Sequence, residues 1–183
     1  MAHHFREYFS SPYILMRLQL FSSNLKSTLP SQPSKKLLFL DFDGVLHPTS
    51  ASGPGLLSKA PLLEAIANED CRIILSTSWR FQYSLEELCA KLPEPVSLKV
   101  IGKTGAPYIG KHPRYYEIVS YISQLDRKLL EWRALDDAYW EFPVGCPELI
   151  RCNPNTGITE REIDIVERWL ALTPNFLDKT HYA

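Results

Sequence analysis

The chain has 183 residues, which is enough for one domain with a short appendage. Its composition, 45% hydrophobic and 22% charged, is that of an ordinary globular protein with a substantial core. The formal net charge is -1, but residues 1–36 carry five basic side chains against one acidic, so the rest of the chain is acidic. An acidic body without a basic stripe argues against tight, nonspecific binding to duplex nucleic acid. No apolar run approaches the roughly 20 residues that a membrane span needs.

Residues 1–36 differ from the rest because they are rich in serine and basic side chains. Their apolar stretch is interrupted at Arg17, which argues against a secretory signal, although the composition also resembles an organellar transit peptide. We predict a loosely attached extension over residues 1–36, followed by one domain over residues 37–183. The four cysteines lack metal-site and C-x-x-C spacing, so we expect free thiols in a reducing compartment and a cytoplasmic protein. No feature of the sequence indicates an obligate protein partner.

From residue 37 onward, strand and helix patterns alternate. Short apolar runs predict five strands, at residues 37–41, 72–76, 96–101, 132–135 and 149–152. Apolar spacing and two capping boxes, which begin at Ser84 and Thr159, predict helices at residues 61–67, 84–92, 113–125 and 159–172. Such alternation is typical of an α/β fold, a Rossmann-like three-layer α/β/α sandwich with a five-stranded parallel sheet.

The first predicted strand runs directly into two carboxylates, Asp41 and Asp43. Residues two apart in extended backbone project to the same side, so these acids share one space, and Gly44 allows a sharp bend after them. Like charges repel in a poorly solvated site, and a bound cation would relieve that cost. Solvated acids in a surface turn are the alternative interpretation.

Polar residues also end two other predicted strands. Ser76 and Thr77 end the second, and Asp136-Asp137 ends the fourth. The carboxyl ends of parallel strands lie at one edge of the sheet, where the pocket of such folds is found. We therefore expect four carboxylates and a hydroxyl cluster in one layer.

Residues 38–46, 73–78 and 134–137, in this order, resemble motifs of the haloacid dehalogenase-like (HAD) phosphohydrolase superfamily. The resemblance extends from residue 37 to about residue 172. Ser76-Thr-Ser-Trp-Arg80, Arg114-x-x-Glu-Ile118 and the segment 153–159 are further similar to the HAD domain of Swiss Army Knife RNA repair proteins.

The resemblance implies a phosphatase in which Asp41 attacks phosphorus and forms an aspartyl-phosphate. Asp43 would be the general acid and base. Mg²⁺ would be held by Asp41, the main-chain carbonyl of Asp43, and Asp136 or Asp137, because it prefers hard oxygen ligands. An acid at the position of Asp43 favours phosphate transfer to water over dehalogenation.

Two roles have alternatives within the sequence. The hydroxyl that binds a phosphate oxygen would be that of Thr77, with Ser76 as the alternative. The cation that stabilises the phosphoryl charge would be Arg114, with Lys111 as the alternative. Each of these side chains has a purely structural interpretation as a helix cap or a solvated charge.

The intervals between motifs are too short for an inserted cap domain, so we expect a capless fold with an open cleft. An open site suits a phosphate on a large molecule, and an RNA or DNA end or a nucleotide is the favoured substrate. A phosphoprotein is the second candidate. A non-catalytic binding module that retains the fold is the competing class.

Overall fold

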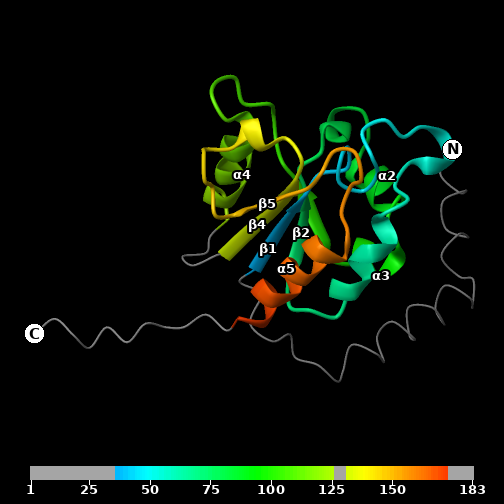
Figure 1. The fold of residues 1–183 in the computed structure, drawn as a ribbon. Coiled ribbons are helices and arrows are strands. Elements are labelled where there is room, and N and C mark those ends of the chain that lie inside the picture. Colours follow the sequence, from blue (N-terminus) through cyan, green and yellow to red (C-terminus); the bar gives the residue numbers. More distant parts are fainter. Residues whose placement is uncertain (1–35, 126–130, 173–183) are drawn as a thin grey trace, which may run out of the picture. The chain divides into compact units, whose positions relative to one another are not determined.

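The computed structural model describes residues 36–125 and 131–172 (Figure 1). It contains one five-stranded parallel sheet with the order β3-β2-β1-β4-β5, as the sequence predicts. The strands are β1 (Lys36–Leu40), β2 (Arg72–Leu75), β3 (Val100–Lys103), β4 (Glu131–Asp136) and β5 (Leu149–Arg151). All but the last residue of the predicted extension 1–36 lies outside the described residues, and its separation from the domain stays a prediction.

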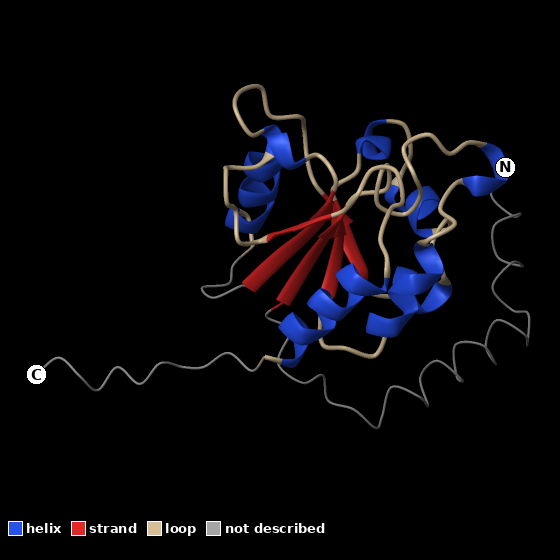
Figure 2. Cartoon of the chain, in the orientation of Figure 1, coloured by secondary structure: helices blue, strands red, loops and turns tan. Residues whose placement is uncertain are grey.

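Helices cover both faces of the sheet (Figure 2). The α-helices are α2 (Leu85–Cys89), α3 (Glu94–Ser97), α4 (Pro113–Ser123) and α5 (Glu160–Ala171). The described residues also contain four 3₁₀ helices in the connections between strands: η1 (Gly53–Gly55), η2 (Ala60–Ile66), η3 (Ser78–Phe81) and η4 (Tyr139–Glu141). Within the described parts of the chain, no helix has the length and apolar character needed to cross a membrane.

The core lies on either side of β1, the central strand. Leu38 and Leu40 pack with residues of η2, α2, α3 and α5 on one face. Leu37 and Phe39 pack with residues of α4 on the other. Because β1 is the middle strand, its carboxyl end lies at the centre of the sheet edge, between the ends of β2 and β4.

The predicted third strand, residues 96–101, is wrong in its position. Val96 belongs to the single-turn helix α3, and the strand begins only at Val100. Pro93 is the N-cap of α3 and Pro95 lies in its first turn, where proline's fixed φ favours a helix. The apolar character of Val96 therefore reflects burial of a helix against the sheet.

Both predicted capping boxes are confirmed. The Glu87 Oε2 atom accepts a hydrogen bond from the Ser84 backbone N–H at 2.7 Å, and Ser84 Oγ accepts one from the Glu87 N–H at 3.2 Å. At the start of α5, the Glu162 Oε2 atom accepts from the Thr159 N–H at 2.9 Å. These contacts satisfy backbone groups that a helix start leaves without partners.

No cap domain is inserted into the sheet within residues 36–125 and 131–172. The connection from β1 to β2 contains only η1 and η2, and the connection from β2 to β3 contains only η3, α2 and α3. The carboxyl edge of the sheet is therefore bordered by loops and short helices, in agreement with the predicted capless fold.

Candidate active site

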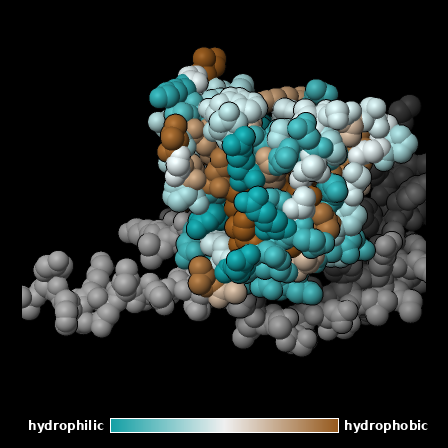
Figure 3. Space-filling model, viewed as in Figure 1, coloured by the Kyte–Doolittle hydropathy of each residue, from teal (hydrophilic) through white to brown (hydrophobic). Residues whose placement is uncertain are grey.

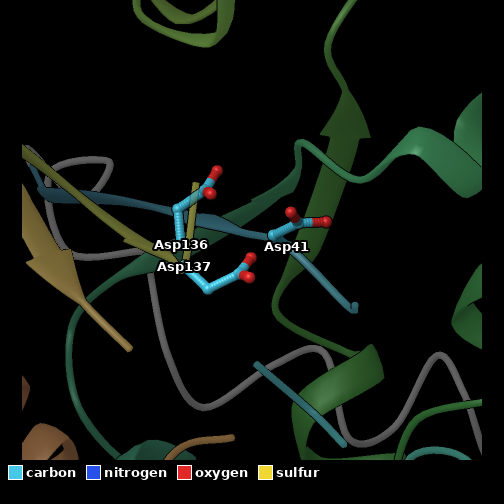
Figure 4. Close-up of side chains that lie close together, drawn as sticks. All are labelled: Asp41, Asp136 and Asp137. Carbon is cyan, nitrogen blue, oxygen red and sulfur yellow. The ribbon is translucent and has the colours of Figure 1, made fainter. Parts of the chain in front are cut away.

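Three carboxylates meet at the carboxyl edge of the sheet. Asp41 directly follows β1 and is fixed by a hydrogen bond from its N–H to the Leu135 carbonyl of β4, at 3.1 Å. Asp136 ends β4, and Asp137 follows it. Asp41, Asp136 and Asp137 each offer an oxygen atom, and these atoms lie within 4.8 Å of one another (Figure 4).

Arg114 binds two of these carboxylates. Its Nη2 atom donates a hydrogen bond to Asp41 Oδ2 at 3.3 Å, and its Nε atom lies 3.1 Å from Asp136 Oδ2 as an ion pair. The side chain is buried, and it enters the site from the first turn of α4. Lys111, the alternative cation, is exposed outside this helix. The structure thus brings Arg114 to the carboxylates.

Arg114 also contacts a buried ion pair formed by Glu117 and Arg80. Glu117 Oε2 lies 2.6 Å from Arg80 Nη2 and 3.9 Å from Arg114 Nη1, and all three side chains are buried. Arg80 also donates to the Thr77 carbonyl at 2.8 Å, which connects α4 to the end of β2. The sequence interpretation gave Glu117 no role, although its position three residues after Arg114 places both on one helix face.

Burial makes these carboxyl groups weaker acids than usual. It raises the pKa of Asp41 to about 6, although Arg114 and the hydroxyl of Thr77 act in the opposite direction. Burial and the charge of Asp41 raise the pKa of Asp136 well above its ordinary value. Burial also raises the pKa of Asp137. Burial therefore disfavours the ionised form of all three carboxylates, and Arg114 offsets only part of that cost.

The three carboxylates fit a divalent cation. Asp136 Oδ2 is buried and has Arg114 Nε at 3.1 Å as an ion-pair partner, but it accepts no hydrogen bond from the described residues. All the ligand atoms are hard oxygens, which Mg²⁺ prefers. A cation at this point would offset the repulsion that burial enforces among Asp41, Asp136 and Asp137.

The carboxylate of Asp43 does not join this cluster. Its Oδ2 atom accepts hydrogen bonds from Trp79 Nε1 at 2.9 Å and from Ser78 Oγ at 3.2 Å, and its Oδ1 atom lies 3.5 Å from His47 Nε2. A contribution of Asp43 to the metal therefore depends on its main-chain carbonyl. With 42% of the side chain exposed, Asp43 can meet a proton donor or acceptor from solvent.

The sequence interpretation missed the groups that hold Asp43. Trp79 and Ser78 belong to η3, which begins where Thr77 Oγ1 accepts a hydrogen bond from the Trp79 N–H at 3.3 Å. This short helix directs the Trp79 ring toward the turn after β1. The position of a tryptophan directly after an active-site strand was the available signal.

Thr77 and Ser76 differ in their contacts. The Thr77 hydroxyl lies close enough to Asp41 to lower the pKa of that carboxyl group, and its oxygen also accepts a hydrogen bond from the Trp79 N–H at 3.3 Å. The Ser76 hydroxyl is buried and has no hydrogen-bond partner among the described residues. The influence of Thr77 on Asp41 favours Thr77 over Ser76 as the phosphate-binding hydroxyl, and that role stays a prediction.

Comparison with known proteins agrees with this geometry. A family model described as "HAD domain in Swiss Army Knife RNA repair proteins" matches residues 37–163, which is more than half of the chain. A search of curated proteins and a search of solved structures each found no match. The matched segment includes all three carboxylates of the cluster, from Asp41 after β1 to Asp137 after β4.

Proposed function

The chain belongs to the family of HAD domains in Swiss Army Knife RNA repair proteins, and we propose that it is a Mg²⁺-dependent phosphatase. Membership of a HAD family supports a hydrolase. One observation favours phosphate transfer in particular. Asp41 lies beside two carboxylates and a buried arginine, while Asp43, two residues later, is held apart by its own donors. The two acids can therefore perform different chemical tasks.

In the proposed reaction, Asp41 is the nucleophile. A carboxylate oxygen of Asp41 attacks the phosphorus, and the bond from phosphorus to the leaving oxygen breaks. Asp43 donates a proton to that oxygen, so that an alcohol leaves and an aspartyl-phosphate remains. Asp43 then takes a proton from water, whose oxygen attacks the phosphorus and releases inorganic phosphate and the free Asp41 carboxylate.

The remaining residues bind and orient the phosphate. The Arg114 guanidinium and the Thr77 hydroxyl lie beside Asp41, where they can donate hydrogen bonds to the phosphoryl oxygens. Mg²⁺, held by Asp41, Asp136 or Asp137 and the Asp43 carbonyl, would offset the repulsion between the nucleophile and an anionic phosphate. The described residues contain no cap domain over the site, so water and substrate would approach it from the carboxyl edge of the sheet.

We propose a nucleic-acid end or a nucleotide as the substrate. The family description and the open carboxyl edge both support a large phosphorylated molecule. A phosphoprotein would use the same open edge. A phosphate-release panel can separate these classes, if it contains oligonucleotides phosphorylated at the 3′ or 5′ end, mononucleotides and phosphopeptides.

The decisive test of catalysis is hydrolysis of a generic aryl phosphate with and without Mg²⁺. We expect the activity to require Mg²⁺ and to vanish in Asp41→Asn, which keeps the shape of the side chain and removes the nucleophile. Glu64→Gln, an exposed change on η2, is the matched control and should retain full activity. Equal rates for the wild type and Asp41→Asn would instead indicate a non-catalytic binding module.

A further inference from the structure

A concave feature lies at the same edge of the sheet as the candidate active site. It is a pocket of about 470 Å³ between the end of β5 and the start of α5, lined among others by Arg151, Arg161 and residues 153–155. Its volume is within the range of small-molecule pockets, roughly 300–1,000 Å³. Arg151 pairs with Asp136 in the sheet, and the N–H of the next residue donates to the Asp136 carbonyl at 3.0 Å. The pocket is therefore one strand away from the carboxylate cluster.

Two arginines give this pocket a positive character. Arg151 and Arg161 are exposed, and neither forms an ion pair within the residues that the structure describes. Glu162 also lines the pocket, but its Oε2 atom already accepts from the N–H and the hydroxyl of Thr159, at 2.9 and 2.6 Å. Two cations without an anionic partner in an acidic domain indicate an anionic ligand.

An aromatic ring connects the pocket to the active-site loop. The Arg151 guanidinium lies over the ring of Tyr139, with its carbon 3.8 Å from the ring centroid. Tyr139 follows Asp137 by two residues, and about half of its surface is exposed. The stack orients the planar guanidinium, and it places an exposed ring against an arginine that lines the pocket.

The pocket wall is also fixed to the loop that follows Asp43. The Ile158 N–H donates to the Val45 carbonyl at 2.7 Å, and the Thr49 N–H donates to the Pro154 carbonyl at 2.8 Å. These hydrogen bonds hold the pocket wall and the loop after Asp43 in a fixed position relative to each other, so a ligand could contact both. On the face drawn in Figure 3, hydrophilic side chains predominate over the middle of the domain.

We propose that this pocket binds the phosphodiester next to the phosphorylated end of a single-stranded nucleic acid, an inference that depends on the proposed function. Arg151 and Arg161 would donate to the diester oxygens, and Tyr139 would lie against a base. Every nucleic acid strand with a phosphorylated end also carries a phosphodiester one nucleotide away from that end. A phosphopeptide whose single phosphate occupies the site at Asp41 offers no such group, so the pocket favours nucleic acid.

The test compares KM values for three substrates: an aryl phosphate, a mononucleotide and a short single-stranded oligonucleotide with the same phosphorylated end. Arg151→Gln and Arg161→Gln should each raise the KM of the oligonucleotide by roughly tenfold, because each removes a hydrogen bond to a charged group. Both should leave kcat for the oligonucleotide and the kinetic constants for the aryl phosphate unchanged. The slope of log KM for the oligonucleotide against log salt concentration should fall by the amount expected for about one lost phosphate contact. Arg72→Gln, an exposed change at the start of β2, is the matched control.

Each other outcome has a definite meaning. Equal losses on all three substrates would show that the arginines support the active site rather than a subsite, and would overturn the proposal. So would unchanged KM values, or a larger effect on a phosphopeptide than on the oligonucleotide. If the wild type hydrolyses no phosphate ester, the proposed function fails. Binding of a fluorescent phosphorylated oligonucleotide then tests the pocket: weaker binding by both variants supports it, and unchanged binding refutes it.

Discussion

Gly44 and Asp137 are in such close contact that only a glycine fits. Gly44 has φ +67°, and a Cβ atom at this position would lie 2.3 Å from the Cγ atom and 2.4 Å from the Oδ2 atom of Asp137. The turn after β1 therefore approaches the loop that carries Asp137 after β4 without any intervening side chain. This contact accounts for the glycine that follows Asp43.

Gly44→Ala should consequently displace the Asp137 carboxylate and abolish stabilisation by Mg²⁺. We expect no rise in melting temperature on adding Mg²⁺, and loss of aryl phosphatase activity. Gly53→Ala is the control, because Gly53 also has a positive φ (+55°) but no atom lies within 4 Å of the position that a Cβ atom would take there. Both variants share the backbone strain of roughly 1–2 kcal/mol, so only the displaced carboxylate distinguishes them. A normal Mg²⁺ response in Gly44→Ala would contradict this account.

Glu117→Gln tests the support behind Arg114. The substitution keeps the shape but leaves Arg80 and Arg114 buried without the shared carboxylate. Removing one partner of a buried pair costs about 3–5 kcal/mol, so the free energy of unfolding measured in urea should fall by a similar amount. Glu160→Gln, on the exposed first turn of α5, should change it little. A change below about 1 kcal/mol would mean that the pair is already solvated.

Arg114→Lys distinguishes the two candidate cations. Lysine keeps the charge but cannot contact Asp41 and Asp136 simultaneously with a planar fork. We expect kcat to fall by about 100-fold, as in the loss of one charge-stabilising donor, with a smaller change in KM. Lys111→Gln should retain wild-type kcat. The opposite pattern, with the loss in Lys111→Gln, would transfer the role to Lys111.

The sequence predicts the position of the carboxylates well because each lies where an apolar strand ends. A parallel sheet necessarily brings the ends of β1, β2 and β4 to one edge, so Asp41, Thr77 and Asp136 come together by topology alone. The ion pair beside them, between Glu117 and Arg80, could not be predicted in this way. Glu117 and Arg80 are 37 residues apart, and no periodic pattern links them.

The misplaced third strand and the unpredicted partners of Asp43 have a common cause. Both depend on single helical turns, α3 and η3, which are too short to leave a repeat in the sequence. The direction in which η3 sends Trp79 follows from one cap, at Thr77. Such local geometry becomes visible only when the backbone is known.

Trp79→Phe tests whether the indole N–H positions Asp43, the proposed general acid and base. Phenylalanine keeps a ring against Phe42, where the centroids are 5.6 Å apart, but removes the donor to Asp43 Oδ2. We expect kcat for an aryl phosphate to fall by roughly tenfold with KM nearly unchanged, because only proton transfer is impaired. Trp140→Phe, on an exposed ring, should have no effect. Should KM rise while kcat stays constant, Trp79 would instead contact substrate.

Without metal, the stability of the domain should depend on pH through the buried carboxylates. The pKa of Asp41 is about 6 in the folded chain and 3.8 in its ordinary state, so between these values the native state holds a proton that the unfolded chain has lost. The native state binds more protons there, and the free energy of unfolding should therefore fall as pH rises from about 4 to about 6. The pKa values of Asp136 and Asp137 are shifted in the same direction and add to this trend.

Mg²⁺ should reverse this trend, because it competes with protons for the same carboxylates. Thermal unfolding at about pH 5 and about pH 7.5, in EDTA and in Mg²⁺, measures both effects. In EDTA the melting temperature should be higher at the lower pH. In Mg²⁺ the gain should appear only at the higher pH, where Asp41 is ionised and can bind the cation. In Asp41→Asn both the slope in EDTA and the gain from Mg²⁺ should shrink, whereas Glu64→Gln should keep them. An equal gain from Mg²⁺ at both pH values would place the binding site away from this cluster.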